Sequence, residues 1–261
     1  MHHFILPTQD SWISSGSLLR DKNFGSDGIL ELKKVFKNNS FEYQTQTLVN
    51  FAGTDFTEMS KSVSSGDIPS NAEYYLRLFE AGGTSELSEE YILSAFPLWK
   101  SWVEGSGKSE DNPKNTNGVS WENRNDIPNG SPVSWSYTEG AKEVAIAGDL
   151  DLNGISFDEI HVAFGSSSQT FGNVTGSDFL GGNDSDDKGG VWVNRAGYIA
   201  SQSFSSQATD VEMDVTDMVN KWLGGNISNY GMILKFSGSQ ETDSTTFGHL
   251  KFFSKDSNTI F

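Results

Sequence analysis

The stretch that decides the fold class is Asp210-Val211-Glu212-Met213-Asp214-Val215-Thr216-Asp217-Met218-Val219-Asn220-Lys221-Trp222-Leu223-Gly224-Gly225. Its first part, residues 211–215, alternates apolar and polar side chains, which is the period of a half-buried strand. Thr216 is expected to cap a short helical turn at residues 217–223, and the Gly pair is expected to end it. A second strand is predicted at residues 229–235. The predicted order of elements in this part of the chain is therefore a strand, one short helix and another strand.

The composition of the 261-residue chain favours the same class. It contains 27 Gly, 18 Phe, 7 Trp and 7 Tyr, and almost no long stretch of amphipathic helical period. Many short strands joined by turns produce such a composition. All-β sandwiches of this size often form one domain with a large core. Residues 1–261 are therefore predicted to form a single β-sandwich domain with one short helix near 217–223.

Several segments occur in the order found in one known domain family. They are Asp10-Ser11-Trp12-Ile13, Asn23-Phe24-Gly25, Leu48-Val49-Asn50-Phe51, Leu76-Arg77-Leu78-Phe79, Trp99-Lys100-Ser101-Trp102-Val103-Glu104-Gly105, Val119-Ser120-Trp121 and the stretch at 210–235. Together they resemble the disaggregatase-related or DNRLRE-type domains, found beside polysaccharide-acting enzymes, on cell surfaces and in tailed-phage particles. The resemblance implies an all-β, jelly-roll-type antiparallel β-sandwich.

The chain departs from that family in two places. Family members usually add a proline and one more alternating strand, whereas this sequence stops at residues 258–261. The closing strand is therefore expected to be missing, disordered or supplied by a neighbour. In addition, residues 137–206 separate segments that lie closer together in ordinary members. We interpret this stretch as a loop-rich insertion that carries extra strands.

The charge of the chain argues against two classes of partner. A net charge of −17 at pH 7 disfavours nucleic acid, because phosphate binding needs clustered Lys and Arg. It also disfavours anionic membranes, and no stretch approaches the ~20 apolar residues of a membrane span. Residues 1–7 lack the basic start and long apolar run of a signal peptide. The chain has no Cys, so disulfides and thiolate chemistry are excluded.

An acidic loop in the expected insertion is a candidate calcium site. Asp149, Asp151 and Asn153 alternate ahead of a Gly, as at the start of a calcium-binding loop. Ile160, however, stands where such a loop needs a bidentate Glu. Calcium and an ordinary Asx-rich turn both remain open here.

A second acidic loop precedes the strand-like residues 191–193. Its crowded carboxylates repel one another, so the loop is either extended in solvent or organised by a cation or a basic partner. If an ion is present, its expected ligands are Asp184, Asp186 and Asp187.

Tryptophans beside Gly-, Ser- and Asn-rich segments are the candidate carbohydrate-binding residues. Flat sugar faces stack on indole rings while nearby polar groups bind the hydroxyls. The candidates are Trp99, Trp102, Trp121 and Trp192. The alternative is that these rings fill the core, and the resemblance implies a structural role for Trp102 and Trp121.

The sequence gives little indication of catalysis. The four His are dispersed, and neither a Gly-x-Ser-x-Gly elbow nor a His-Glu-x-x-His pair occurs. Residues 105–109 end like a phosphate-binding loop, but Trp102 stands where its first Gly belongs. Adjacent acids such as Glu89 and Glu90 would point to opposite faces of a strand, whereas glycoside hydrolysis needs two carboxylates at one bond. We therefore expect that the chain is not an enzyme.

The expected function is a non-enzymatic structural or adhesion component of a tailed-phage virion, built on a jelly roll similar to carbohydrate-binding modules. Its partners would be neighbouring virion proteins or copies of itself. The alternative is a carbohydrate-binding module of a polysaccharide-acting or cell-surface protein, with glycans as ligands. Virion membership follows from the resemblance, since one sandwich fold hosts many functions.

Overall fold

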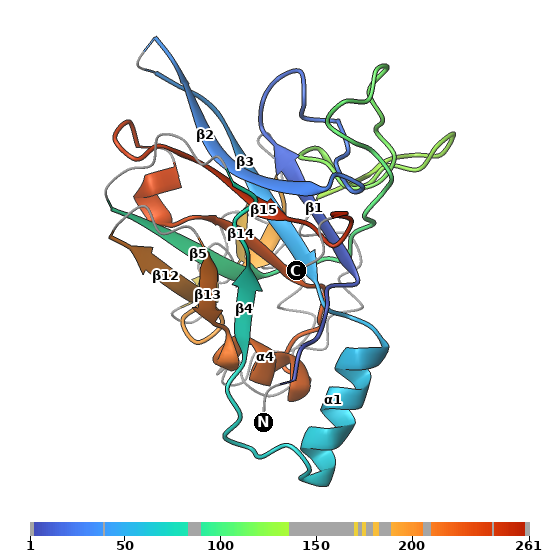
Figure 1. Ribbon diagram of the computed structural model, residues 1–261, viewed down its shortest axis with the longest axis vertical. Coiled ribbons are helices and arrows are strands. Elements are labelled where there is room, and N and C mark those ends of the chain that lie inside the picture. The colour runs from blue at the N-terminus through green and yellow to red at the C-terminus, as the bar shows by residue number, and fades with distance from the viewer. Residues whose placement is uncertain are drawn as a thin grey trace.

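The computed structural model describes residues 3–38, 40–82, 90–135, 189–205, 210–241 and 243–258, together with three short strands between 170 and 182. Most of the regular structure in these residues is antiparallel strand (Figure 1). The helices among the described residues are α1 (Thr54–Ser65), α4 (Thr216–Leu223) and the short 3-10 helix η2 (Gly238–Glu241). The predicted all-β class is therefore confirmed.

The main sheet has the strand order β12-β5-β14-β3-β2-β15, and β1 also pairs with β3. Its strands are β1 (Gln9–Ser14), β2 (Ile29–Lys37), β3 (Ser40–Asn50), β5 (Tyr91–Pro97), β12 (Ala200–Phe204), β14 (Met232–Phe236) and β15 (Gly248–Phe253). The first part of β3 pairs with β2, whereas its second part pairs with β1 and β14. Because β3 changes partners along its length, the sheet curls around it.

A second layer faces this sheet and closes the curl. It consists of the paired strands β4 (Tyr75–Leu78) and β13 (Val211–Asp214). Beyond the end of β4, Ala81 donates its backbone N–H to the Lys251 carbonyl of β15 at 2.8 Å. On the other side, the Glu212 N–H of β13 donates to the Gln202 side chain of β12 at 2.9 Å. The curled sheet fits a β-sandwich, and β15 lies between β2 and residues 79–81 rather than at an open edge.

Short strand pairs complete the described elements. They are β6 (Asn123–Asn125) with β7 (Val133–Ser134), β8 (Thr170–Phe171) with β9 (Val174–Thr175), and β10 (Leu180–Gly182) with β11 (Val191–Val193). The last two pairs and β12 fall within the expected insertion at 137–206. Much of that insertion lies outside the described residues, so its division from the sandwich stays a prediction.

The predicted helix after β13 is confirmed, but its predicted cap is wrong. Helix α4 buries Met218, Val219 and Trp222 against the core. Its N-cap residue is Val215, whose own side chain cannot cap it, and the Asp214 carboxylate accepts the Thr216 N–H at 2.9 Å. Thr216 is instead the first helical residue, and its hydroxyl accepts a hydrogen bond from the Tyr74 N–H at 2.9 Å. The hydroxyl therefore anchors the entry to β4 and does not cap the helix.

Helix α1 was not predicted from the sequence. Its sequence is rich in Ser and Thr and has no continuous apolar stripe, so the helical period is weak. Phe56 packs its ring against Trp222 with the centroids 6.2 Å apart, and Gly66 ends the helix with φ of 83°. Figure 1 shows α1 beside α4, at the opposite end of the molecule from the β2–β3 hairpin. The contact between Phe56 and Trp222 thus stabilises a helix that the local sequence pattern does not predict.

Candidate functional site

The loops at one end of the sandwich are joined through the buried side chain of Asn23. Its Nδ2 donates to the carbonyl oxygens of Glu104 at 2.6 Å and Val119 at 2.7 Å. Its Oδ1 accepts from the N–H groups of Gly25 at 3.1 Å and Gly107 at 2.7 Å. We call these five residues the Asn23 brace. The brace joins three sequence segments that were singled out separately as motifs.

Glycines allow the segments of the brace to approach so closely. A Cβ atom on Gly25 would lie 2.0 Å from the carbonyl oxygen of Glu104. A Cβ on Gly105, where φ is +83°, would lie 2.0 Å from the carbonyl oxygen of Asn117. Neither approach is compatible with a side chain, because backbone atoms cannot move aside. The Gly in each motif therefore has a packing role.

Aromatic stacking and hydrogen bonds also connect β1 to the turn at 23–27 and the loop at 105–118. The rings of Trp12 and Phe24 are stacked with centroids 3.6 Å apart. The Trp12 indole donates to Asp27 Oδ2 at 3.0 Å, while Ser109 donates its N–H to Asp27 Oδ1 at 3.2 Å. Burial raises the pKa of the Asp27 carboxyl, and these hydrogen bonds oppose that rise. β1, the 23–27 turn and the 105–118 loop thus form one connected unit.

The four tryptophans predicted to bind carbohydrate all lie in the core, with 2% to 8% of their surface exposed. They are Trp99, Trp102, Trp121 and Trp192. The indole of Trp102 donates to the Tyr230 carbonyl at 3.0 Å. Gly189 lies against the ring of Trp121 and donates its N–H to the Trp121 carbonyl at 2.8 Å. Sugar stacking on these rings stays a prediction, and it would require the surrounding loops to move.

The residues predicted to bind calcium are not part of the described structure. All six lie between positions 137 and 188, outside the described residues: Asp149, Asp151, Asn153, Asp184, Asp186 and Asp187. A calcium site in either loop stays a prediction.

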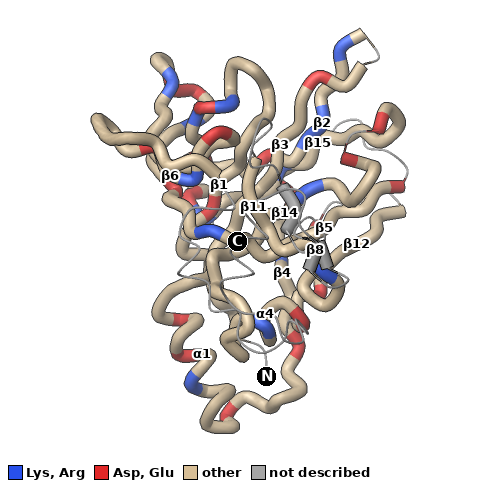
Figure 2. Tube along the Cα trace, turned by 180° about the vertical axis from the view of Figure 1, so that it is seen from behind, with Lys and Arg blue, Asp and Glu red and all other residues tan. Residues whose placement is uncertain are grey.

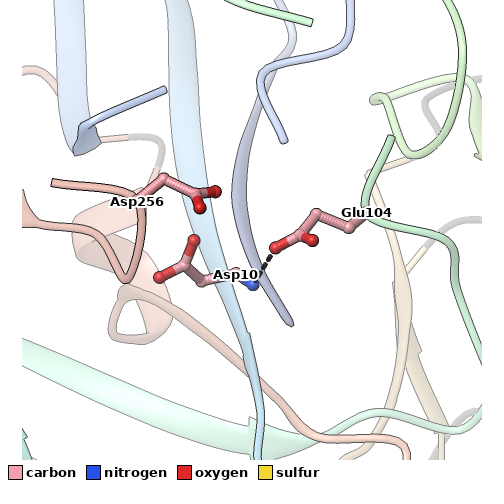
Figure 3. A group of neighbouring side chains, drawn as sticks. All are labelled: Asp10, Glu104 and Asp256. Atoms are coloured by element: carbon pink, nitrogen blue, oxygen red, sulfur yellow. Dashed lines mark hydrogen bonds between the residues drawn. The ribbon is translucent and has the colours of Figure 1, made fainter. Parts of the chain in front are cut away.

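A different acidic cluster is present beside the Asn23 brace. It consists of Asp10 from β1, Glu104 from the loop after β5 and Asp256 from the segment after β15 (Figure 3). One carboxylate oxygen of each residue lies within 4.8 Å of the other two. Asp10 is buried, Glu104 is partly buried and Asp256 is exposed at the rim. The cluster therefore extends from the buried carboxylate of Asp10 to the solvent-exposed carboxylate of Asp256.

Two backbone donors and one lysine stabilise the acidic cluster. Glu104 Oε1 accepts from the Asp10 N–H at 2.8 Å, and Asp10 Oδ2 accepts from the Lys255 N–H at 2.6 Å. The Lys255 ammonium lies 3.2 Å from Glu104 Oε1 and 2.9 Å from Asp256 Oδ2. Lys255 therefore contacts all three carboxyl groups: its ammonium bridges the two outer ones, and its backbone N–H binds Asp10.

Burial changes the acidity of this cluster. It raises the pKa of Asp10 to about 7, and the neighbouring Glu104 and Asp256 carboxylates add to the rise. Burial also raises the pKa of Glu104, although hydrogen bonds from Asp10 and Lys255 oppose it. A second cation in the cluster would favour the ionised form of both groups.

Sequence reasoning missed this cluster, although it marked two of its members. Asp10 and Glu104 stood in the motif segments as a strand start and a loop residue. Nothing in the sequence placed Asp256 beside them, because it follows β15 and lies more than two hundred positions from Asp10. The available signal was an acidic residue at the start of an otherwise buried strand.

A polar groove of about 490 Å³ lies on the same loop end. Its lining residues are Asp111, Pro113, Lys114, Asn115, Thr116, Asn117 and Pro128. The Asn115 carbonyl accepts the Asn23 N–H at 2.8 Å, which connects the groove wall to the brace. Figure 2 shows basic and acidic residues interspersed over the loops near β1 and β6. The groove offers amide, hydroxyl and charged groups on a loop that is held in place.

Neither a protein-family model nor a curated protein sequence matches this chain.

Among the helices of the described residues, none has the length and apolar character required to span a bilayer.

Proposed function

We propose that this chain is a non-enzymatic structural or adhesion protein that uses its braced loop end for recognition. The observation that carries the proposal is the Asn23 brace, in which one buried side chain holds the turn after β1 and the loops at 104–107 and 119. Loops held in one conformation lose less entropy on binding, which favours a recognition surface. The polar groove is built on these same loops.

The setting we propose is a tailed-phage virion, where neighbouring virion proteins or copies of this chain would be the partners. This part of the proposal is supported by the sequence resemblance to DNRLRE-type domains. The geometry adds that the residues which carry the resemblance, including Asn23, Gly25 and Glu104, interact with one another. The Asn23 brace suits a protein whose loops at this end contact a ligand while its β-sandwich packs against neighbouring proteins.

A carbohydrate-binding module is the second candidate. The groove supports it, because Asn115, Thr116 and Asn117 provide amide and hydroxyl groups of the kind that bind sugar hydroxyls. Lys114 at the groove is already paired with Asp21 at 2.6 Å, so an acidic polysaccharide would have to share its charge with that carboxylate.

A glycan-array screen combined with light scattering tests both candidates. A defined oligomer that binds no glycan would support the assembly role. Selective glycan binding by a monomer would support the carbohydrate module, provided that Lys114→Ala with Thr116→Ala abolishes it. Lys61→Ala on α1 is the matched control, since Lys61 is an exposed lysine that pairs only locally with Glu58. A monomer that binds no glycan would contradict the carbohydrate module and assembly from copies of this chain, and release of reducing sugar from a polysaccharide would contradict a non-enzymatic role.

A further inference from the structure

We propose that Asp10, Glu104 and Asp256 bind a hard divalent cation of the calcium class. The three residues come from β1, from the loop after β5 and from the segment after β15. The inference is independent of the proposed function, because it concerns how the loop end is held together and not what it recognises. It also differs from the calcium sites that the sequence suggests at residues 149–153 and 184–187.

The spacing of the three carboxylates suits one ion. Ca²⁺ binds carboxylate oxygens at 2.3–2.6 Å, so two ligands on opposite sides of it are separated by about 5 Å. The contributing oxygens lie within 4.8 Å of one another, so a single ion can reach all three. Figure 3 shows the Asp10 and Asp256 carboxyl groups facing each other, with the Glu104 carboxylate directed at the Asp10 backbone N–H. The remaining positions of a six- to eight-coordinate ion would be open to water, because Asp256 lies at the exposed rim.

A buried atom without a partner provides a second, independent indication. Asp10 Oδ1 is inaccessible to solvent and accepts no hydrogen bond, although Asp10 Oδ2 accepts one from the Lys255 N–H. The residue as a whole is 2% exposed. Buried carboxylate oxygens are normally satisfied by donors or by a metal, because leaving one unpaired is costly. A cation in the cluster would satisfy this oxygen.

Lys255 is the competitor that a metal ion must displace. Its ammonium bridges Glu104 and Asp256, which is the position that a cation between the outer carboxylates would take. A lysine ammonium is a compact charge on a flexible stem, so it can rotate toward solvent when a divalent ion enters. The Lys255 side chain is 22% exposed, so part of it already reaches solvent. Removal of the ammonium should therefore strengthen the binding of the divalent ion.

Thermal melts of the whole chain in EDTA and in Ca²⁺ test the site. At a Ca²⁺ concentration about 100 times the dissociation constant, the melting temperature of the wild type should rise by roughly 5–10 °C. Asp10→Asn and Asp256→Asn should each abolish the rise. Lys255→Met should enlarge the rise at subsaturating Ca²⁺. Calorimetric titration of the same variants with Ca²⁺ measures binding independently of unfolding.

Control variants separate this site from the acidic loops. Asp151→Asn and Asp186→Asn should leave the response to Ca²⁺ unchanged, as should the exposed Glu42→Gln on β3. A response that persists in Asp256→Asn, or that disappears in Asp151→Asn or Asp186→Asn, would overturn the proposal. It would also be overturned if neither the wild type nor Lys255→Met bound Ca²⁺. Asp256 lies at the rim, so its variant decides the question even if Asp10→Asn fails to fold.

Discussion

The side-chain amide of Asn23 donates to the main-chain carbonyl of Glu104 at 2.6 Å, across 81 positions of sequence. The carboxylate of that same Glu104 accepts the backbone N–H of Asp10 at 2.8 Å. Glu104 thus links the Asn23 brace to the acidic cluster through two different groups.

Replacement of Asn23 by Ala should destabilise the protein by about 3 kcal/mol or more, since it leaves several buried donors and acceptors without partners. Chemical denaturation measures the loss. Asn71→Ala is the matched control, because Asn71 lies in an exposed turn and its replacement should change stability by less than ~0.5 kcal/mol. Equal effects of the two variants would contradict the role of the brace.

Gly25→Ala should destabilise the protein by more than ~2 kcal/mol, because the new Cβ would overlap the Glu104 carbonyl oxygen. Gly28→Ala is the control in the same turn. The nearest atom to a Cβ at Gly28 is 3.8 Å away, and this variant should be neutral or slightly stabilising. Melting temperatures of the two variants provide the comparison, and a neutral Gly25→Ala would show that the loops are not packed as described.

The stability of the chain in EDTA should fall as pH rises through neutrality. The pKa of Asp10 is raised from 3.8 to about 7 in the folded chain, so folding takes up a proton between these values. The contribution of Asp10 is complete below about pH 4 and is lost as pH rises through 7. Glu104, Asp256 and Lys255 are the charged groups that face it.

Asp10→Asn should flatten this pH profile, because the amide cannot ionise. The change for one proton is at most about 1.4 kcal/mol per pH unit. Melting temperatures between pH 5 and pH 8 measure it, with Glu42→Gln as an exposed control that should keep the wild-type profile. An equally steep profile in Asp10→Asn would mean that another group is responsible.

Thr216→Ala should cost about 1 kcal/mol, because the Tyr74 N–H loses its hydrogen-bond acceptor. Thr216→Ser keeps the hydroxyl and should cost clearly less. Denaturant unfolding of both variants distinguishes the two cases. If the two costs are the same, packing of the Thr methyl group and not the hydrogen bond stabilises this junction.

The sequence by itself determined the local elements where the pattern was strong. The alternation at 211–215 indicated β13, and the apolar positions Val219, Trp222 and Leu223 indicated α4, because side-chain period directly reflects backbone geometry. It also marked Asn23 and Gly25 in one motif and Glu104 in another. Helix α1 was not found, since its few apolar residues carry no clear period.

Only the tertiary structure decided which of these residues meet. The packing of the sheets buries the predicted sugar-binding tryptophans, turns the Thr216 hydroxyl toward Tyr74 and brings Asp256 beside Asp10. Local pattern depends on neighbours within one turn or one strand, and so the sequence alone could reveal it. The brace and the acidic cluster depend on how β1, the loop after β5 and the segment after β15 are placed by long-range strand pairing, which no local pattern encodes.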